Sequence, residues 1–337
     1  MIKKDNGQGS FYRHIYDEVI PKEHFLKKLS DAVDFSFVND VCESVYCEDF
    51  GRPAYEPLMM FKITFLEFLY ELSDRAVCED LQVNLAYKWF VGLDVCEASP
   101  DATSLTKFRN RLGAERFKEC FNAVVEQARG KNLITDKLQI IDATHMEARV
   151  DLFRLKEEHK RDEDDDTYVD RHSPDPDARF GRKSEKKSFY GYKAHAAVDA
   201  ESELFVSVEV SPGNSPDGGH FVPLLNGSPV AATADKAYDA EDNHAHLRKQ
   251  KIHDAIIRKN NRAYAFVVNL AYESEQRKRP RIERRFADGK KYHGLRVCRY
   301  WGLWRTKIQV LMTALVCNCK RMVKLLLEPV KLSCGAD

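Results

Sequence analysis

Apolar residues recur at helical spacing through much of the first 135 residues. The run EPLMMFKITFLEFLYELS is rich in aromatic residues and predicts a buried helix. A second helix is expected to follow, with Ser73 as its N-cap. Residues 99–133 then predict two more helices that break near Gly113, whereas residues 1–50 give only weak helical signals. Two short helices joined by a tight turn are compatible with helix-turn-helix DNA binding, but a plain helical bundle is the favoured alternative.

The pattern changes at Leu138, where LQIIDATHMEA predicts a strand. Two β-rich runs around the polar turn DAESE predict a hairpin, and further short strands and helices follow. The polar stretch near 156–187 has no apolar period, so it predicts a loop or a partly disordered insert. This order of elements indicates an α/β fold, a mixed sheet with helices on its faces. We therefore expect an all-α region over 1–135, a mixed α/β domain over 136–330, and a tail at 331–337.

Composition narrows the class of protein. The chain has 337 residues, of which 43% are hydrophobic, so a globular protein of about two domains is expected. Its formal net charge is +0, which argues against binding nucleic acid by bulk charge alone. The nine cysteines form no CxxC pair, so a structural zinc site is not expected. An odd number of cysteines and the missing signal peptide favour a reducing cytoplasm, and no apolar run approaches the roughly 20 residues of a membrane span.

Three acidic residues stand out by their positions. Asp142 lies within the first predicted strand, Asp235 ends the apolar run VAATA, and Glu283 lies in a strongly basic helix that starts at Pro280. Each has an ordinary alternative: an edge aspartate, a helix cap and a salt-bridged surface glutamate. Together they suggest a site for Mg²⁺, which prefers oxygen ligands. Two such ions can activate an attacking oxygen and stabilise the leaving oxygen of a phosphodiester.

The cations of the C-terminal third point to a polyanion. Residues 258–307 contain fifteen lysines and arginines but only four acidic residues, which favours a phosphate backbone as the partner. Aromatic side chains are interleaved with them: Tyr292, His293, Tyr300, Trp301 and Trp304. They could stack on unpaired bases, although core packing is the favoured alternative for the two tryptophans.

These motifs resemble those of bacterial insertion-sequence DDE transposases, of the group typified by insertion sequence five. The likeness rests on IDATHMEA around Asp142, on ADKAYDAEDN around Asp235, and on the third motif. The third motif keeps the family's Arg, Glu and Lys spacing with Arg279, Glu283 and Lys290, but Gln276 stands where the family has Tyr. The segments GYKAH and SPGNSPDGGHF also look like the family's middle part, and the likeness covers roughly 50–325.

The resemblance implies a fold, a site and an activity. It implies a ribonuclease H-like catalytic core preceded by an all-α DNA-binding domain. Asp142, Asp235 and Glu283 would be the catalytic residues and would bind two Mg²⁺ ions, for which Mn²⁺ may substitute. The enzyme would bind the terminal inverted repeats of its element, cleave the DNA ends and join the 3′-hydroxyls to target DNA. The residues expected to contact DNA phosphates are Arg279, Lys290, Lys193, His195, Arg284 and Arg285.

Several expectations accompany this activity. For Lys193 and His195, an exposed lysine and a satisfied strand histidine are equally good alternatives. The expected partners are double-stranded DNA and a second copy of the chain in a homodimer, with no membrane, in the bacterial cytoplasm near the nucleoid. Two other functions stay open: an inactive DNA-binding regulator derived from such an enzyme, and a host Mg²⁺-dependent nuclease.

Overall fold

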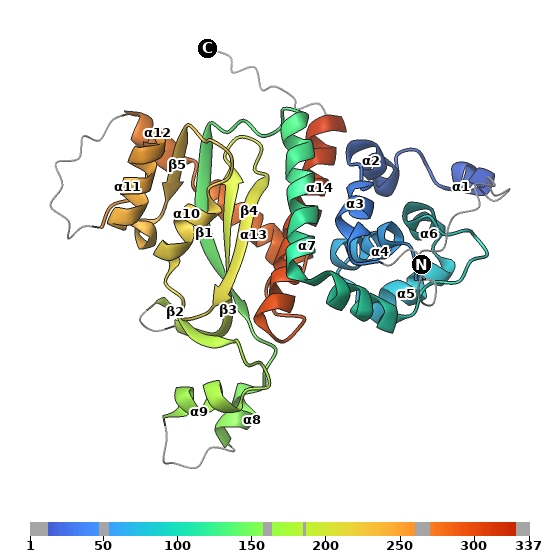
Figure 1. Cartoon of the computed structure of the whole chain (residues 1–337), viewed down its shortest axis with the longest axis horizontal. Helices are drawn as coiled ribbons and strands as arrows, with labels where there is room; N and C mark the ends of the chain where they lie inside the picture. The colour runs from blue at the N-terminus through green and yellow to red at the C-terminus, as the bar shows by residue number, and fades with distance from the viewer. Residues whose placement is uncertain (1–12, 47–53, 158–163, 185–186, 260–269, 328–337) are drawn as a thin grey trace. The chain divides into compact units, whose positions relative to one another are not determined.

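The chain forms two compact units in the computed structural model, which describes residues 13–46, 54–157, 164–184, 187–259 and 270–327 (Figure 1). One unit combines Met1–Leu133 with Asn318–Asp337, and the other is Ile134–Cys317. The sequence predicts a domain boundary between residues 135 and 136. It also predicts that residues up to 330 belong to the domain that contains the sheet. The structure groups the chain from Asn318 onward with the helices instead. The predicted tail at 331–337 lies outside the described residues.

The first unit is helical, as its apolar periodicity predicts. Its described helices are α1 (Arg13–Val19), α2 (Phe25–Ala32), α3 (Phe37–Glu43), α4 (Pro57–Leu69), α5 (Asp74–Val83), α6 (Leu85–Val91) and α7 (Ala102–Gly130). Helix α4 is the centre of this unit, because it contacts α3, α5, α6 and α7. Its Phe61, Phe65 and Phe68 are fully buried. Phe65 packs edge-on against Phe35, with ring centroids 5.3 Å apart.

Local signals in the sequence set the helix ends of this unit. The Ser73 hydroxyl accepts a hydrogen bond from the backbone N–H of Ala76 at 3.1 Å, which confirms the predicted cap of α5. Gly113 has φ 65° and ψ 175° and breaks α7 where the sequence predicted a break. Residues 1–50 gave only weak helical signals in the sequence, yet the structure forms the helices α1, α2 and α3 there.

The second unit is built on a mixed sheet. Its strands are β1 (Leu138–Glu147), β2 (Arg179–Ser184), β3 (Lys187–Asp199), β4 (Phe205–Pro212), β5 (Ala231–Ala234) and β6 (His253–Asp254). The order is β2-β3-β1-β5-β6, and β4 pairs with β3. Strand β3 is antiparallel to β1, β2 and β4, whereas β5 is parallel to β1 and β6 is parallel to β5. The predicted α/β class, the mixed sheet and the helical region before it are therefore confirmed.

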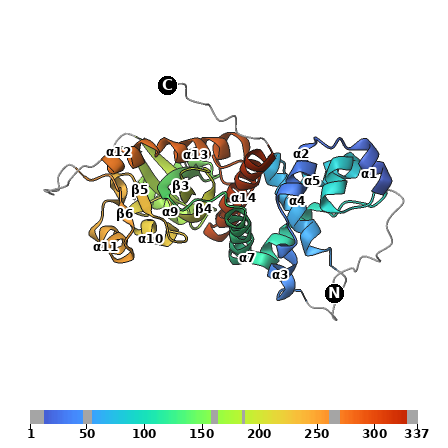
Figure 2. The same cartoon turned by 90° about the horizontal axis from the view of Figure 1, so that it is seen from above.

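Helices cover both faces of this sheet (Figure 2). The remaining helices of the second unit include α10 (Phe221–Leu224), α11 (Glu241–Gln250), α12 (Leu270–Arg277), α13 (Pro280–Tyr292) and α14 (Leu303–Leu327), the last of which ends in the other unit. Helices α12 and α13 lie on one face, with α13 against β1, and α10 and α11 lie on the other. No helix in the described part of the chain is long and apolar enough to span a bilayer.

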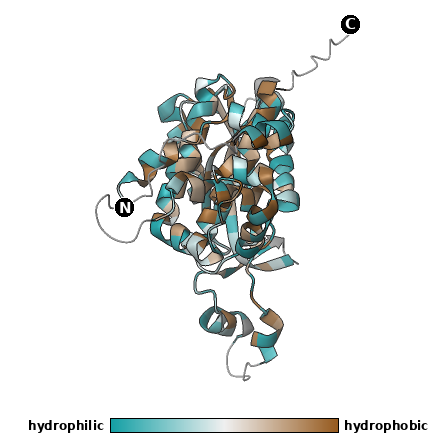
Figure 3. Cartoon of the chain, turned by 90° about the vertical axis from the view of Figure 1, so that its right-hand side faces the viewer, coloured by the Kyte–Doolittle hydropathy of each residue, from teal (hydrophilic) through white to brown (hydrophobic). Residues whose placement is uncertain are grey.

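The charged insert is more ordered than its composition predicted. It contains α8 (Leu152–Glu157) and α9 (Asp165–His172), which project beyond the strands (Figure 3), and its strand β2 pairs with β3. Asp164 caps α9 by accepting from the N–H of Thr167 at 3.3 Å. At the base of the insert, the buried Asp175 accepts a hydrogen bond from the Tyr192 hydroxyl at 2.5 Å. The expectation of a loop was wrong because one cap and one buried polar anchor order a segment that has no apolar period; residues 158–163 lie outside the described part.

Candidate active site

The first two acidic residues lie side by side where the short strand β5 ends next to the middle of β1. In the β1–β5 register Ile141 pairs with Ala234, so the next residues, Asp142 and Asp235, lie on neighbouring strands about 4.8 Å apart. Strand β5 ends at Ala234, and the Asp235 carboxylate caps the following turn by accepting from the N–H of Ala237 at 2.8 Å. Sites of open α/β sheets form at the carboxyl ends of parallel strands.

The third acidic residue comes from helix α13. Proline at position 280 fits the first turn of the helix, as predicted. Ile282 and Phe286 are buried, and α13 packs against β1. Glu283 therefore lies in the first turn on the exposed side, with 58% of its side chain exposed. The Arg279 guanidinium donates to its carboxylate at 3.4 Å.

Electrostatics connects the three carboxylates. Burial, helped by the negative charges of Asp235 and Glu283, raises the pKa of Asp142 to about 6. The N–H of Ala143 and the positive charge of Arg279 oppose this shift. The predicted trio is thus brought close enough for each of the other two to act on Asp142.

The donor chemistry of this group fits a hard cation. All three side chains are carboxylates, and Asp142 carries a charge that its surroundings penalise, which a divalent ion would relieve. Within the described residues, however, no three or more His, Cys, Asp or Glu side chains are arranged as a metal site. Glu283 faces Arg279 in this structure, so it would have to exchange that partner for the ion. An exposed glutamate changes rotamer at little cost, so the Glu283 carboxylate can turn toward Asp142 and Asp235.

The predicted phosphate contacts on α13 differ in their accessibility. Arg279 lies beside Glu283, and Lys290 lies two turns farther along the same stripe of the helix. Arg284 is exposed and pairs with Glu203 at 2.7 Å. Arg285 is only 8% exposed and binds Asp288 at 2.9 Å and the carbonyl oxygen of Cys317 at 3.3 Å. The structure does not support a DNA contact for Arg285, because this side chain ties α13 to α14.

Lys193 and His195 lie on the face of the sheet opposite Asp142. His195 pairs with Ala143 and is fully buried, with its Nε2 2.8 Å from the Ser211 hydroxyl. Burial, followed by the charges of His220 and Lys193, lowers the pKa of His195 to about 3. Lys193 forms an ion pair with Asp217 at 2.9 Å. The structure therefore favours the strand-histidine alternative for His195 and gives it no route to a phosphate.

The aromatic residues of the basic segment are mostly exposed. Trp301 and Tyr292 are 48% exposed and Trp304 is 38% exposed. Core packing, the favoured alternative for both tryptophans, is therefore wrong. Trp301 donates its indole N–H to the carbonyl oxygen of Arg149 at 3.1 Å, whereas His293 is buried.

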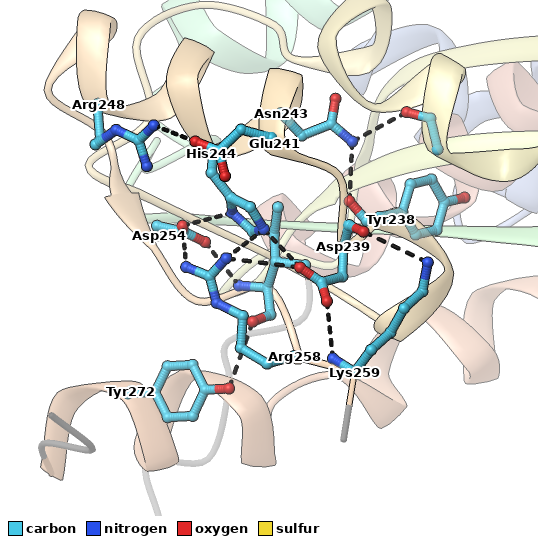
Figure 4. A network of polar contacts seen from close by, with 12 residues as sticks. Tyr238, Asp239, Glu241, Asn243, His244, Arg248, Asp254, Arg258, Lys259 and Tyr272 are labelled. Atoms are coloured by element: carbon cyan, nitrogen blue, oxygen red, sulfur yellow. Dashed lines mark hydrogen bonds and ion pairs between the residues drawn. The ribbon is translucent and has the colours of Figure 1, made fainter. Parts of the chain in front are cut away.

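One polar cluster escaped sequence analysis. His244 lies between the carboxylates of Asp239 and Asp254 (Figure 4). These residues come from α11, from the turn after Tyr238 and from β6, and no spacing or charge run in the sequence marks them as a group. The only signal was that Asp239 follows a predicted site aspartate by four residues.

Two protein families and a solved structure are similar to this chain. Residues 14–111 match a family described as "Transposase domain (DUF772)", and residues 135–319 match one described as "Transposase DDE domain". A solved cryo-EM structure of a piggyBac transposase synaptic complex with hairpin DNA is similar at 10% identity with a TM-score of 0.42, over 90% of this chain and 73% of that chain. The second family match alone spans more than half of the sequence and contains all three acidic residues. The chain therefore belongs to the transposase DDE domain family and is a DDE transposase.

Proposed function

We propose that this transposase binds the inverted repeats at the ends of its own insertion sequence, cleaves there and joins the freed 3′-hydroxyls to target DNA. The observation that carries the proposal is the register of β1 and β5, which sets Asp142 beside Asp235. Burial and the charges of Asp235 and Glu283 raise the pKa of Asp142, in agreement with a shared acidic group. A cluster of acids whose charge is unfavourable without a cation is what two-metal phosphoryl transfer needs.

The three carboxylates would hold Mg²⁺. When bound, the metal supplies activation of the attacking oxygen and stabilisation of the leaving oxygen at a phosphodiester. The chain provides the rest. The partial burial of Asp142 limits competing water, and the first turn of α13 brings Glu283 to the edge where Asp142 and Asp235 end.

The cations of α13 would position the DNA strand. Arg279 already faces the carboxylates through Glu283, so its guanidinium can pair with a phosphate when Glu283 turns to the metal. Lys290, eleven residues after Arg279, lies about 16.5 Å farther along the helix. The two side chains would bind successive stretches of the same backbone.

The helical unit would supply recognition of the element's ends. Helices α5 and α6 are separated only by Asn84, which suits a compact helix pair able to enter a groove. Because two ends must be joined, we expect the active species to be a homodimer.

The experiment is Mg²⁺-dependent cleavage of a supercoiled plasmid carrying the element's ends, with Asp142→Ala as the test variant. Asp242→Asn, an exposed aspartate on α11, is the matched control. We expect the first to lose at least about a thousandfold in rate while still binding the ends, and the second to match the wild type. Cleavage by Asp142→Ala would overturn the assignment. Binding without cleavage by the wild type would favour the regulator, and cleavage without strand transfer the host nuclease.

A further inference from the structure

In the buried polar cluster around His244, two carboxylates hold the histidine (Figure 4). His244 Nδ1 lies 2.7 Å from Asp254 Oδ2, and its Nε2 lies 2.7 Å from Asp239 Oδ1. The side chains of His244 and Asp239 are fully buried. Arg258 Nη1 also contacts His244 Nε2, so charged partners hold the imidazole on both sides.

Arg258 joins the two carboxylates as well. Its Nη2 lies 2.7 Å from Asp254 Oδ2, and its Nη1 lies 3.6 Å from Asp239 Oδ1. The two carboxylates thus converge on one imidazole and one guanidinium. These contacts occupy the Asp239 carboxylate within the protein and hold the cluster together.

The cluster fixes two pieces of backbone at the catalytic edge. Asp239 follows Asp235 by four residues, and its Oδ2 accepts from the backbone N–H of Lys259 at 2.8 Å. Asn243 holds the same turn by donating to the carbonyl oxygen of Tyr238 at 2.9 Å. The turn that carries a catalytic acid is therefore tied directly to the chain just after β6.

That link determines where Lys259 lies. Strand β6 is parallel to β5, and the N–H of Ile257 bonds to the carbonyl oxygen of Ala234 at 3.0 Å, so the chain beyond Ile257 passes the same edge as Asp235. Lys259 is exposed. One strand spacing and an offset of two residues place its Cα roughly 8 Å from that of Asp235, and the long side chain can carry the ammonium group to roughly 10 Å. Its ammonium group contacts only weakly the Asp239 carbonyl oxygen, at 3.5 Å.

We propose that Lys259 binds a phosphate of the DNA a few nucleotides from the cleaved bond, and that Asp239 and His244 are positioning residues for it. The inference rests on the proposed function. A DNA strand rises 3.4 Å per nucleotide, so a cation about 10 Å from the acids meets the backbone about three nucleotides away. The Asp239 carboxylate binds the backbone N–H of Lys259, whereas, among the described residues, the Lys259 ammonium group meets only the Asp239 carbonyl oxygen.

The test compares Lys259→Gln with Lys251→Gln. Lys251 is also exposed and is the C-cap of α11, before β6, whereas Lys259 follows β6, so each variant removes one positive charge from a segment next to this strand. Binding to a duplex of the element's end is measured over a range of salt concentrations. For Lys259→Gln we expect affinity to fall about three- to tenfold and the log–log salt slope to drop by about one. Lys259→Arg should restore both, and Lys251→Gln should change neither. Equal behaviour of the two Gln variants overturns the phosphate contact.

The positioning role has its own readout. If Asp239 acts through Lys259, Asp239→Asn lowers the salt slope, and adding Lys259→Gln to it lowers the slope no further. Additive losses of slope overturn the positioning role. Wild type and Asp142→Ala are assayed for cleavage beside these variants. Cleavage that survives in Asp142→Ala contradicts the proposed function, whereas an unchanged slope in Lys259→Gln contradicts only this inference.

Discussion

At the scale of single residues, the site is a place where charge opposes folding. Asp142 lies in a strand whose other side chains form a core, and its neighbours include two more acids. Such local conflicts are expected where function, and not stability, selects the residue. The sequence marks Asp142 for the same reason, because it is an acidic residue within a predicted apolar strand.

This conflict predicts that Asp142→Asn stabilises the metal-free protein. The folded pKa of about 6 lies above the ordinary value of 3.8, so the folded state binds the proton more tightly than the unfolded state. The cost of the charge is absent below about pH 4, grows as pH rises, and is complete above about pH 6, where it reaches roughly 3 kcal/mol. Chemical unfolding in EDTA should show the variant more stable than wild type at pH 8 and equal to it at pH 4. A less stable variant at pH 8 would contradict this account.

Mg²⁺ should stabilise the wild type relative to Asp142→Asn, the reverse of the order expected in EDTA. An ion that binds only the folded state adds about 1.4 kcal/mol at ten times its Kd. We expect Mg²⁺ to raise the Tm of the wild type and to leave the Tm of Asp142→Asn nearly unchanged, as measured by calorimetry without DNA. Equal shifts in both proteins would place the bound ion elsewhere.

At the scale of elements, sequence patterns identified what local signals determine. Apolar periodicity predicted α4, the polar turn predicted the β3–β4 hairpin, and Pro280 predicted the start of α13. The three acids followed because each ends or interrupts a recognisable element. The helices of residues 1–50 and the insert were missed, since their order comes from caps and tertiary packing. The cluster of His244 was missed because its partners meet only after β5 and β6 pair.

Register between β1 and β3 depends on one glycine. Gly191 has a φ of +151°, and a Cβ there would lie 2.2 Å from the carbonyl oxygen of Met146. Backbone atoms cannot yield as a flexible side chain would, so Gly191→Ala should cost at least about 2 kcal/mol or prevent folding. Gly219→Ala, where a Cβ meets nothing within 4 Å, should be nearly neutral. Urea unfolding of both variants checks this; equal stabilities would show that β3 relaxes away from β1.

At the scale of the whole molecule, the basic run is balanced by acids from elsewhere in the fold. The formal charge of the chain is +0, and the partners of the cations around α13 include two glutamates in the turn between β3 and β4. Glu201 lies 2.6 Å from Lys278 and 3.4 Å from Arg281, and Glu203 lies 2.7 Å from Arg284. This turn therefore lowers the positive potential that α13 presents to DNA.

Removing that balance should tighten DNA binding. In the double variant Glu201→Gln, Glu203→Gln, three cations lose their carboxylate partners and can pair with phosphates, each adding about 0.9 to the log–log salt slope. We expect stronger binding to duplex DNA of any sequence at low salt and a steeper slope, with less than about 1 kcal/mol lost in stability because these pairs are partly exposed to solvent, which weakens them. Glu241→Gln, which frees Arg248 on α11 from a 2.5 Å pair, is the matched control and should change neither quantity. If both variants steepen the slope equally, DNA responds to the total charge of the protein and not to α13. If neither does, DNA approaches by another face, and the contacts proposed for Arg279 and Lys290 lose their support.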